Sequence, residues 1–160
     1  MLILCDTRQQ AGKHENIEKY FIKSGIEFDR QALYVGDYII ANDGRRAVDT
    51  KYGVIELAHD IMSEDHERFR RECERAQAAG IDLLVLIEEE LPPGGLGNWE
   101  SPMDRFGKPR TLVKGESLKL ALLTMTVKYD VRFRFCSPKQ TGRCIMEYLA
   151  EGVMPGDKAK

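Results

Sequence analysis

The sequence lacks the features that mark membrane proteins, secreted proteins and cysteine-based metal sites. None of its apolar runs approaches the roughly 20 residues that a membrane span requires. The start MLILCDTRQQ is too short for a signal peptide. The four cysteines form no C-x-x-C pair and no cluster with the three histidines. We therefore expect a cytoplasmic protein with free thiols, no zinc site and no membrane partner.

Neither sign of charge dominates the chain. The 24 Lys and Arg residues face 26 Asp and Glu residues, and the net charge of −2 gives no general attraction to a polyanion. A nucleic-acid partner would need a local basic surface. One candidate exists, since Arg68, Arg70, Arg71 and Arg75 fall within eight residues. A solvated helix face would give the same run, and both interpretations stay open.

The length and the apolar patterning indicate one α/β domain. We expect it to span residues 1–150, with a flexible tail over 151–160. The patterning predicts strands at 1–5, 26–33, 35–41, 45–51, 81–87 and 131–136, and helices at 12–24, 57–62, 64–79, 115–129 and 138–150. This order predicts a mixed central sheet of four or five strands flanked by helices, with an αβββαβ core. The segment between 91 and 114 reads as a long loop, which in a small domain is mobile or functional.

Three acids and one lysine lie at strand ends or on a strand edge. Asp6 follows the first strand, Asp37 lies in the run YVGDY, and Asp49 and Lys51 lie in the run VDTK. Residues two apart on a strand point to the same face, so we expect Asp49 and Lys51 to be neighbours.

The turn between the two middle strands decides whether Asp37 joins them. A three-residue loop over 42–44, with its glycine left-handed, would pair Asp37 with Asp49 on one face. A two-residue loop over 43–44 would pair Asp37 with Thr50 and turn Asp49 to the other face. The chemistry of the site therefore depends on the register of this hairpin.

Two adjacent carboxylates repel each other unless a positive charge lies between them. Magnesium, which takes oxygen ligands, suits such an open and partly hydrated site. A metal there could activate water, and Lys51 could hold that water and neutralise developing charge. Each residue also has a simpler interpretation: Asp6 as a turn cap, Asp37 as a turn residue, and Asp49 with Lys51 as an exposed ion pair. Their joint occurrence at strand ends favours a site.

The helix predicted at 64–79 has two faces. Phe69, Cys73 and Ala76 should face the sheet. A second stripe, suited to a DNA backbone, comprises Arg68, Arg71 and Arg75. Ion pairs with Glu64 and Glu67 would leave that stripe partly neutralised instead. Glu72 lies close to the apolar side, where it could support the metal ligands or reach past the edge to solvent.

Two aromatic residues of the long loop have two interpretations. Trp99 and Phe106 could stack on the bases of opened DNA. We expect instead that both pack and hold the loop against the body of the domain.

At these residues the chain resembles the nuclease domain of XPF-type structure-specific endonucleases, which belongs to the PD-(D/E)XK superfamily with its restriction-endonuclease-like fold. The matching pieces are DTR at 6–8, VGDY at 35–38 and VDTK at 48–51, then an arginine-bearing helix and the apolar strand at 81–87. The resemblance implies magnesium- or manganese-dependent cleavage of DNA, often at branched structures, in DNA repair, recombination or phage DNA processing. It also suggests a compact relative of the kind that bacteria and phages encode.

The resemblance assigns roles to individual residues. It implies that the catalytic residues are Asp6, Asp37, Asp49 and Lys51, and that the three aspartates also serve the metal. It implies DNA contacts by Arg8 and by the arginine stripe of the 64–79 helix.

The chain departs from the pattern of this family at three positions. Gln9 stands where the family has an acid, Thr50 where it has arginine, and Ile55 where it has its last acid, with Glu56 one place later. Gln9 could still support the metal ligands. These losses favour a second hypothesis, a non-catalytic DNA-binding or scaffolding module with the same fold. The intact central acids and lysine favour the nuclease.

A homodimer or heterodimer partner is the last expectation. Apolar residues that could form an interface, or equally the core, are Leu118, Leu120, Leu122, Leu123, Ile145 and Leu149.

Overall fold

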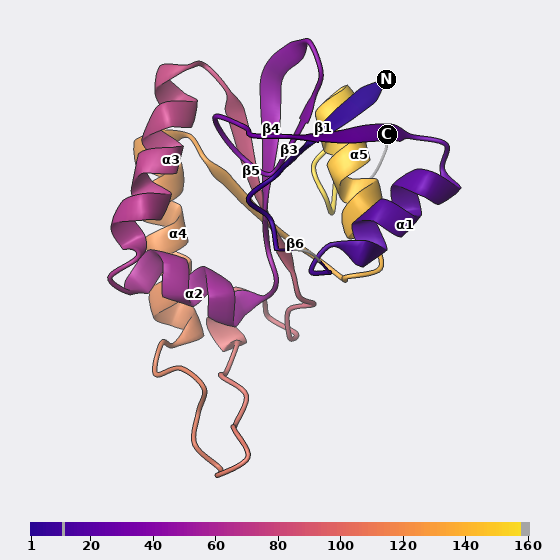
Figure 1. Ribbon diagram of the computed structural model, residues 1–160. Helices are drawn as coiled ribbons and strands as arrows, with labels where there is room; N and C mark the ends of the chain where they lie inside the picture. Colours follow the sequence, from indigo (N-terminus) through magenta and orange to yellow (C-terminus); the bar gives the residue numbers. More distant parts are fainter. Residues whose placement is uncertain (11, 158–160) are drawn as a thin grey trace.

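In a computed structural model that describes residues 1–10 and 12–157, six strands form one mixed sheet with helices on both faces (Figure 1). The elements are β1 (Leu2–Asp6), α1 (Glu15–Lys23), β2 (Glu27–Gln31), β3 (Tyr38–Ile40), β4 (Asp43–Lys51), α2 (Val54–Met62), α3 (His66–Ala78), β5 (Asp82–Glu88), the 3-10 turn η1 (Leu96–Asn98), α4 (Gly115–Tyr129), β6 (Arg132–Cys136) and α5 (Thr141–Glu151). The α/β class expected from the sequence is confirmed.

The strand order across the sheet is β2-β1-β3-β4-β5-β6. The pairings β1–β3 and β3–β4 are antiparallel, and the other three are parallel. The expected total of four or five strands is wrong, because all six predicted strands join the same sheet. The two at its edges are β2, which is almost entirely exposed, and β6, which pairs on one side with β5.

Alternating side chains of the central strands feed two separate cores. Leu83, Val85 and Ile87 of β5 face the layer of α2, α3 and α4. Leu84 and Leu86 of the same strand face α1 and α5. This double coverage explains why β5 is an unbroken apolar run. In the ranges 1–10 and 12–157, no helix is both long enough and apolar enough to cross a membrane.

The turn between β3 and β4 differs from the expected one. Ile40 pairs with Asp43, and the left-handed residue is Asn42, with φ 64°, rather than Gly44. Asparagine tolerates this conformation better than most residues. A bulge then leaves 44–46 without partners in β3, and the register recovers at Ile39, which opposes Ala47. The turn is therefore not the expected one, but the register beyond it is the one that the three-residue loop predicted, with Tyr38 opposite Val48.

Part of the C-terminal segment that was expected to be flexible, 151–160, packs against the core instead. The last helix, α5, ends at Glu151, and Met154 is buried in the core on the α1 and α5 side. Residues 158–160, the end of the expected flexible tail, lie outside the described residues.

The core predicts a large difference between two leucine truncations. Leu86, at the centre of β5, is 0% exposed, so Leu86→Ala should lower the free energy of unfolding by about 2–5 kcal/mol. Leu120, on the outer side of α4, is 64% exposed, so Leu120→Ala should change it by less than about 0.5 kcal/mol. Urea unfolding followed by circular dichroism measures both. Equal losses would contradict the assignment of the core.

Candidate active site

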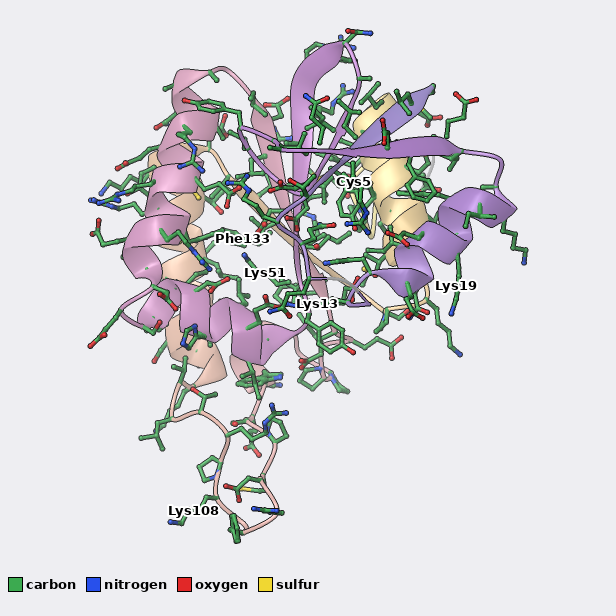
Figure 2. All side chains as sticks on the ribbon, in the orientation of Figure 1. Cys5, Lys13, Lys19, Lys51, Lys108 and Phe133 are labelled. Carbon is green, nitrogen blue, oxygen red and sulfur yellow. The ribbon has the colours of Figure 1, made fainter. Side chains whose placement is uncertain are left out.

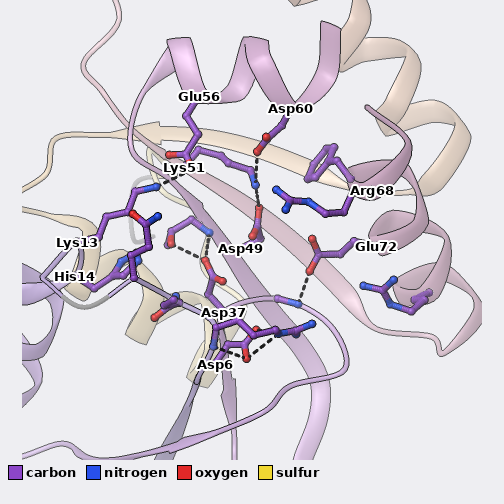
Figure 3. Close-up of a pocket in the computed structure, with 17 residues that line it drawn as sticks. Asp6, Lys13, His14, Asp37, Asp49, Lys51, Glu56, Asp60, Arg68 and Glu72 are labelled. Carbon is purple, nitrogen blue, oxygen red and sulfur yellow. Dashed lines mark hydrogen bonds and ion pairs between the residues drawn. The ribbon is translucent and has the colours of Figure 1, made fainter. Parts of the chain in front are cut away.

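Three aspartates form one row across three neighbouring strands. The registers of β1 with β3 and of β3 with β4 continue to Asp6 opposite Asp37 and to Asp37 opposite Asp49. The backbone N–H of Asp6 donates to the carbonyl of Asp37 at 2.8 Å, and the N–H of Asp37 donates to the carbonyl of Val48 at 2.7 Å. All three aspartates line one pocket together with Lys51 (Figure 3). The registers of β1 with β3 and of β3 with β4 thus bring together the four residues that the sequence singled out.

Gly36 allows the chain to enter this row. Its φ is +72°, and a Cβ there would lie 3.0 Å from the carbonyl oxygen of Val48 and 3.1 Å from the Cβ of Ala47. A side chain would therefore be strained and crowded by β4. The N–H of Gly36 donates to Oε1 of Glu72 at 2.8 Å, so the same glycine links the row to α3. Glu72 lies in the pocket wall rather than reaching out to solvent.

Thr50 holds the carboxylate of Asp37. Both its backbone N–H, at 2.8 Å, and its hydroxyl, at 2.7 Å, donate to Oδ2 of Asp37. Burial raises the pKa of Asp37, and the two bonds from Thr50 oppose that rise. Thr50 therefore fixes Oδ2 of this carboxylate and does not bond to Oδ1.

The ammonium of Lys51 lies between two carboxylates inside the protein. Its Nζ is 2.8 Å from Oδ2 of Asp49 and 2.9 Å from Oδ2 of Asp60 (Figure 3). Burial alone would lower the pKa of Lys51, which is 7% exposed, but the two carboxylates outweigh burial and raise the pKa. Lys51 is therefore charged. Its Nζ also lies 4.9 Å from the centroid of the Phe69 ring.

Asp60 is the functional candidate that the sequence analysis missed. It is buried on α2, among the apolar residues Leu57, Ala58 and Ile61. An acid within an apolar helix stripe requires a partner, and this was the available signal. The sequence could show the anomaly on the helix but not that Lys51 supplies the partner.

Asp49 is a strongly perturbed acid of the row. It is 5% exposed, and burial raises its pKa to about 7. The charge of Lys51 lowers that value, whereas the neighbouring carboxylate of Asp37 raises it. Such a carboxylate ionises fully only when more positive charge is nearby.

Asp6 already has a cationic partner. The Nε of Arg8 donates to both of its oxygens, at 3.1 and 2.8 Å, and a terminal nitrogen of Arg8 lies 2.7 Å from Oδ2. That guanidinium also donates to the carbonyl of Leu33 at 2.6 Å. Asp6 therefore lies beside the other two acids but is neutralised from the rim of the pocket, where Arg8 is largely exposed.

The arginine stripe of α3 is divided between pocket and solvent. Arg68 and Arg75 line the pocket, whereas Arg71 is exposed outside it. The ion pairs on this helix join Arg70 to Glu67 and Glu74, so they do not involve the stripe. The three apolar residues expected to face the sheet, Phe69, Cys73 and Ala76, are buried.

A further wall comes from the segment before α1 and from the start of α2. Lys13 Nζ is 2.8 Å from Oε1 of Glu56, whose other oxygen accepts the N–H of Tyr52 at 2.6 Å. His14 lies beside them, and burial lowers its pKa. The side-chain nitrogen of Gln9 is buried in the same wall. No sequence pattern pointed to Lys13 or His14.

The donor set suits a hydrated cation better than a closed metal cage. Within the described ranges, no three side chains of Asp, Glu, His or Cys gather closely enough to hold a metal by themselves. Magnesium usually takes only one or two carboxylates and completes its shell with water and substrate phosphate. Asp37 and Asp49, which share one pocket and repel each other, have the chemistry to fill that limited role.

Comparisons with known proteins concern the family and the fold of the chain. A model of the ERCC4 domain matches residues 5–147. The structure of XPF from Aeropyrum pernix is similar, with a TM-score of 0.66 and 17% identity over 93% of this chain and 63% of that one. A complex of XPF from Aeropyrum pernix with DNA gives a TM-score of 0.65 and 17% identity over 99% of this chain and 68% of that one. This chain therefore spans about two thirds of their length. No curated protein matches it.

Burial of Glu72 predicts a pH-dependent effect on stability. Its pKa is raised by burial first and by Asp49 second. A raised pKa in the folded state stabilises the fold below the unfolded pKa, and this contribution is lost as pH rises through the folded value. Glu72→Gln should therefore gain melting temperature relative to the wild type between pH 5 and pH 8.5. Differential scanning fluorimetry with chelator measures it, and the exposed Glu64→Gln serves as the control. A difference that does not change with pH would contradict the assignment.

Proposed function

Because this chain belongs to the ERCC4 domain family, we propose that it is a metal-dependent endonuclease that hydrolyses DNA phosphodiester bonds. The observation that carries the proposal is the convergence of Asp37, Asp49 and a charged Lys51 in one pocket. DNA as the substrate is supported by the similar XPF structure that is a complex with DNA. The arginines at the pocket rim offer contacts for its phosphates.

Asp37 and Asp49 would hold the metal, magnesium or manganese, through their carboxylates. When bound, a divalent cation supplies positive charge next to the scissile phosphate and makes a water molecule a better nucleophile. Asp6 would take part only if Arg8 released it. A DNA phosphate offers Arg8 an alternative partner, so binding of substrate and release of Asp6 would be coupled.

Lys51 would position the attacking water. Its ammonium forms ion pairs with Asp49 and Asp60 and carries three N–H donors. A donor directed into the pocket would hold the water or a phosphate oxygen on which charge develops. Asp60 would act through Lys51 by keeping it charged and by fixing its place.

A non-catalytic DNA-binding module is the second candidate. The ion pair of Asp6 with Arg8 favours it, because it occupies one of the three expected metal ligands. The amide at Gln9 and the alkyl chain at Ile55 favour it for the same reason, since the related nucleases carry acids there.

The nuclease proposal predicts loss of cleavage in two variants. Asp37→Asn keeps an oxygen for the bonds from Thr50, so the fold should survive while the anionic ligand is lost. Lys51→Ala removes the water-positioning group. Each should lower the cleavage rate at least about 100-fold.

The assay uses the purified chain with duplex, single-stranded, flap and four-way DNA, with magnesium or with chelator. The exposed Lys23→Ala is the control and should cleave at the wild-type rate. Full activity in Asp37→Asn would reject the site. A wild-type chain that binds DNA equally in chelator and cleaves none of the substrates would identify the non-catalytic module.

We also propose that α4 contacts a second copy of the chain. Of the apolar residues considered for an interface, four are buried in the core: Leu118, Leu122, Ile145 and Leu149. Leu120, Leu123 and Val127 remain exposed on one side of α4, next to a groove that runs along the edge strand β6. A helix that is apolar on its outer side is typical of an interface.

This interface predicts a change in oligomeric state. Leu123→Glu with Val127→Glu should convert a dimer into a monomer, because the two charges would have to be desolvated on association. Light scattering coupled to size-exclusion chromatography measures the mass. Leu112→Glu, at an exposed position outside α4, is the control. A wild-type chain that is monomeric at about 100 μM would overturn the proposal.

A further inference from the structure

The segment at 99–114 forms a structured arm that extends away from the body beyond α2 (Figure 1). Two hydrogen bonds close it near its middle: Asp104 N–H donates to the Lys108 carbonyl at 2.7 Å, and Arg110 N–H donates to the Pro102 carbonyl at 2.9 Å. Met103 and Pro109 form an antiparallel bridge between them. The arm therefore has a defined hairpin-like shape.

Both ends of the arm are anchored to the body. Trp99 is buried, and its Nε1–H donates to Oε2 of Glu89 at 2.6 Å. On the other side, Gly115 begins α4 so close to η1 that a Cβ would lie 2.1 Å from the carbonyl oxygen of Leu96. The expectation that Trp99 packs is confirmed.

Phe106 at the tip of the arm does not pack, contrary to expectation. Its side chain is 72% exposed, and the guanidinium carbon of Arg105 lies 4.7 Å from its ring centroid. The carboxylate of Asp104 holds the turn by accepting the N–H groups of Phe106 and Lys108 at 2.8 and 3.0 Å. The turn thus presents an aromatic ring to solvent on a fixed backbone.

The arm is basic although the chain as a whole is not. It contains only two acids, Glu100 and Asp104, but four cations: Arg105, Lys108, Arg110 and Lys114. All four are exposed, and across the described part of the chain none of them lies within 4.0 Å of a carboxylate oxygen. Figure 2 shows Lys108 near the outer end of the arm, well away from the labelled Lys51. Free cations around an exposed ring are complementary to a nucleic-acid strand.

We propose that the arm binds single-stranded DNA, with Phe106 stacked on a base and Arg105, Lys108 and Arg110 on the flanking phosphates. The proposal rests on the proposed function, because it takes DNA as the substrate. A single strand is favoured over a duplex, because a base can stack on Phe106 only where it has lost a stacking neighbour. The arm would then recognise an unpaired segment while the pocket holds the phosphodiester to be cut.

The ring is tested by fluorescence anisotropy of the full chain with oligothymidylate and with a duplex, in chelator so that no strand is cut. Phe106→Ala should weaken binding of oligothymidylate at least about fivefold and change duplex binding less than about twofold. Leu112→Ala, which removes an exposed apolar side chain from the same arm, should change neither. Unchanged binding of oligothymidylate by Phe106→Ala overturns the proposal, as does an equal loss for the duplex.

The cations are tested by the salt dependence of the same binding. Replacing Arg105, Lys108 and Arg110 by glutamine should make the slope of log K against log salt for oligothymidylate shallower by about 2, since each phosphate contact to a single strand contributes about 0.7. The matched control replaces Lys23, Lys128 and Lys139, which lie outside the arm, by glutamine and should keep the wild-type slope. Equal slopes in both triple variants overturn the proposal.

Cleavage separates this inference from the proposed function. A wild-type chain that cuts DNA, combined with arm variants that bind oligothymidylate normally, refutes the arm alone. A wild-type chain that cuts nothing, combined with arm variants that lose oligothymidylate, refutes the nuclease and supports the arm.

Discussion

The ion pairs of Lys51 with Asp49 and Asp60 are the interaction on which the site depends. Burying an unpaired charge costs several kcal/mol, so none of the three groups would stay ionised in the interior without the others. Two of them belong to β4 and the third to α2. The pairs therefore fix the helix over the strand end as well as the charge of the lysine. The same helix also packs its apolar residues Leu57, Ala58 and Ile61 in the core, so the ion pairs add to that packing at the edge of the pocket.

The interior of the pocket has an excess of negative charge. Asp49 and Asp60 pair with the ammonium of Lys51, and Asp37 and Glu72 line the same pocket. The pKa values of Asp37, Asp49 and Glu72 are raised. Burial is the first cause in each case, and repulsion between the acids adds to it. A bound cation would relieve both, and this is the physical reason to propose a metal there.

Much of the fold and of the row could be predicted, because both follow from local periodicity. The strands repeat with a period of two, so the correct hairpin pairing places Asp37, Asp49 and Lys51 on one face. Asp6 joins them through the separate pairing of β1 with β3, which the hairpin pattern does not contain. The turn itself was not predictable from Gly44, because a bulge in β4 changed which residue is left-handed. Asp60 and Phe106 were missed or misassigned for another reason: their partners, or lack of them, depend on how α2 and the arm pack in space. Periodicity carries no information on that.

The departures from the family pattern bear on whether the site is used. Where the related nucleases carry arginine, Thr50 places two donors on Asp37, so this carboxylate is still held in position. Ile55 stands where the related nucleases carry their last acid. The helix α2 still supplies two acids to the pocket, Glu56 and Asp60. Both lie on a helix that also packs in the core, so selection for stability alone would favour apolar residues at the buried position. Replacing a buried acid and its lysine by apolar side chains of similar volume is often neutral or stabilising, so their presence is not explained by stability. This is a physical reason to propose that the pocket does more than support the fold.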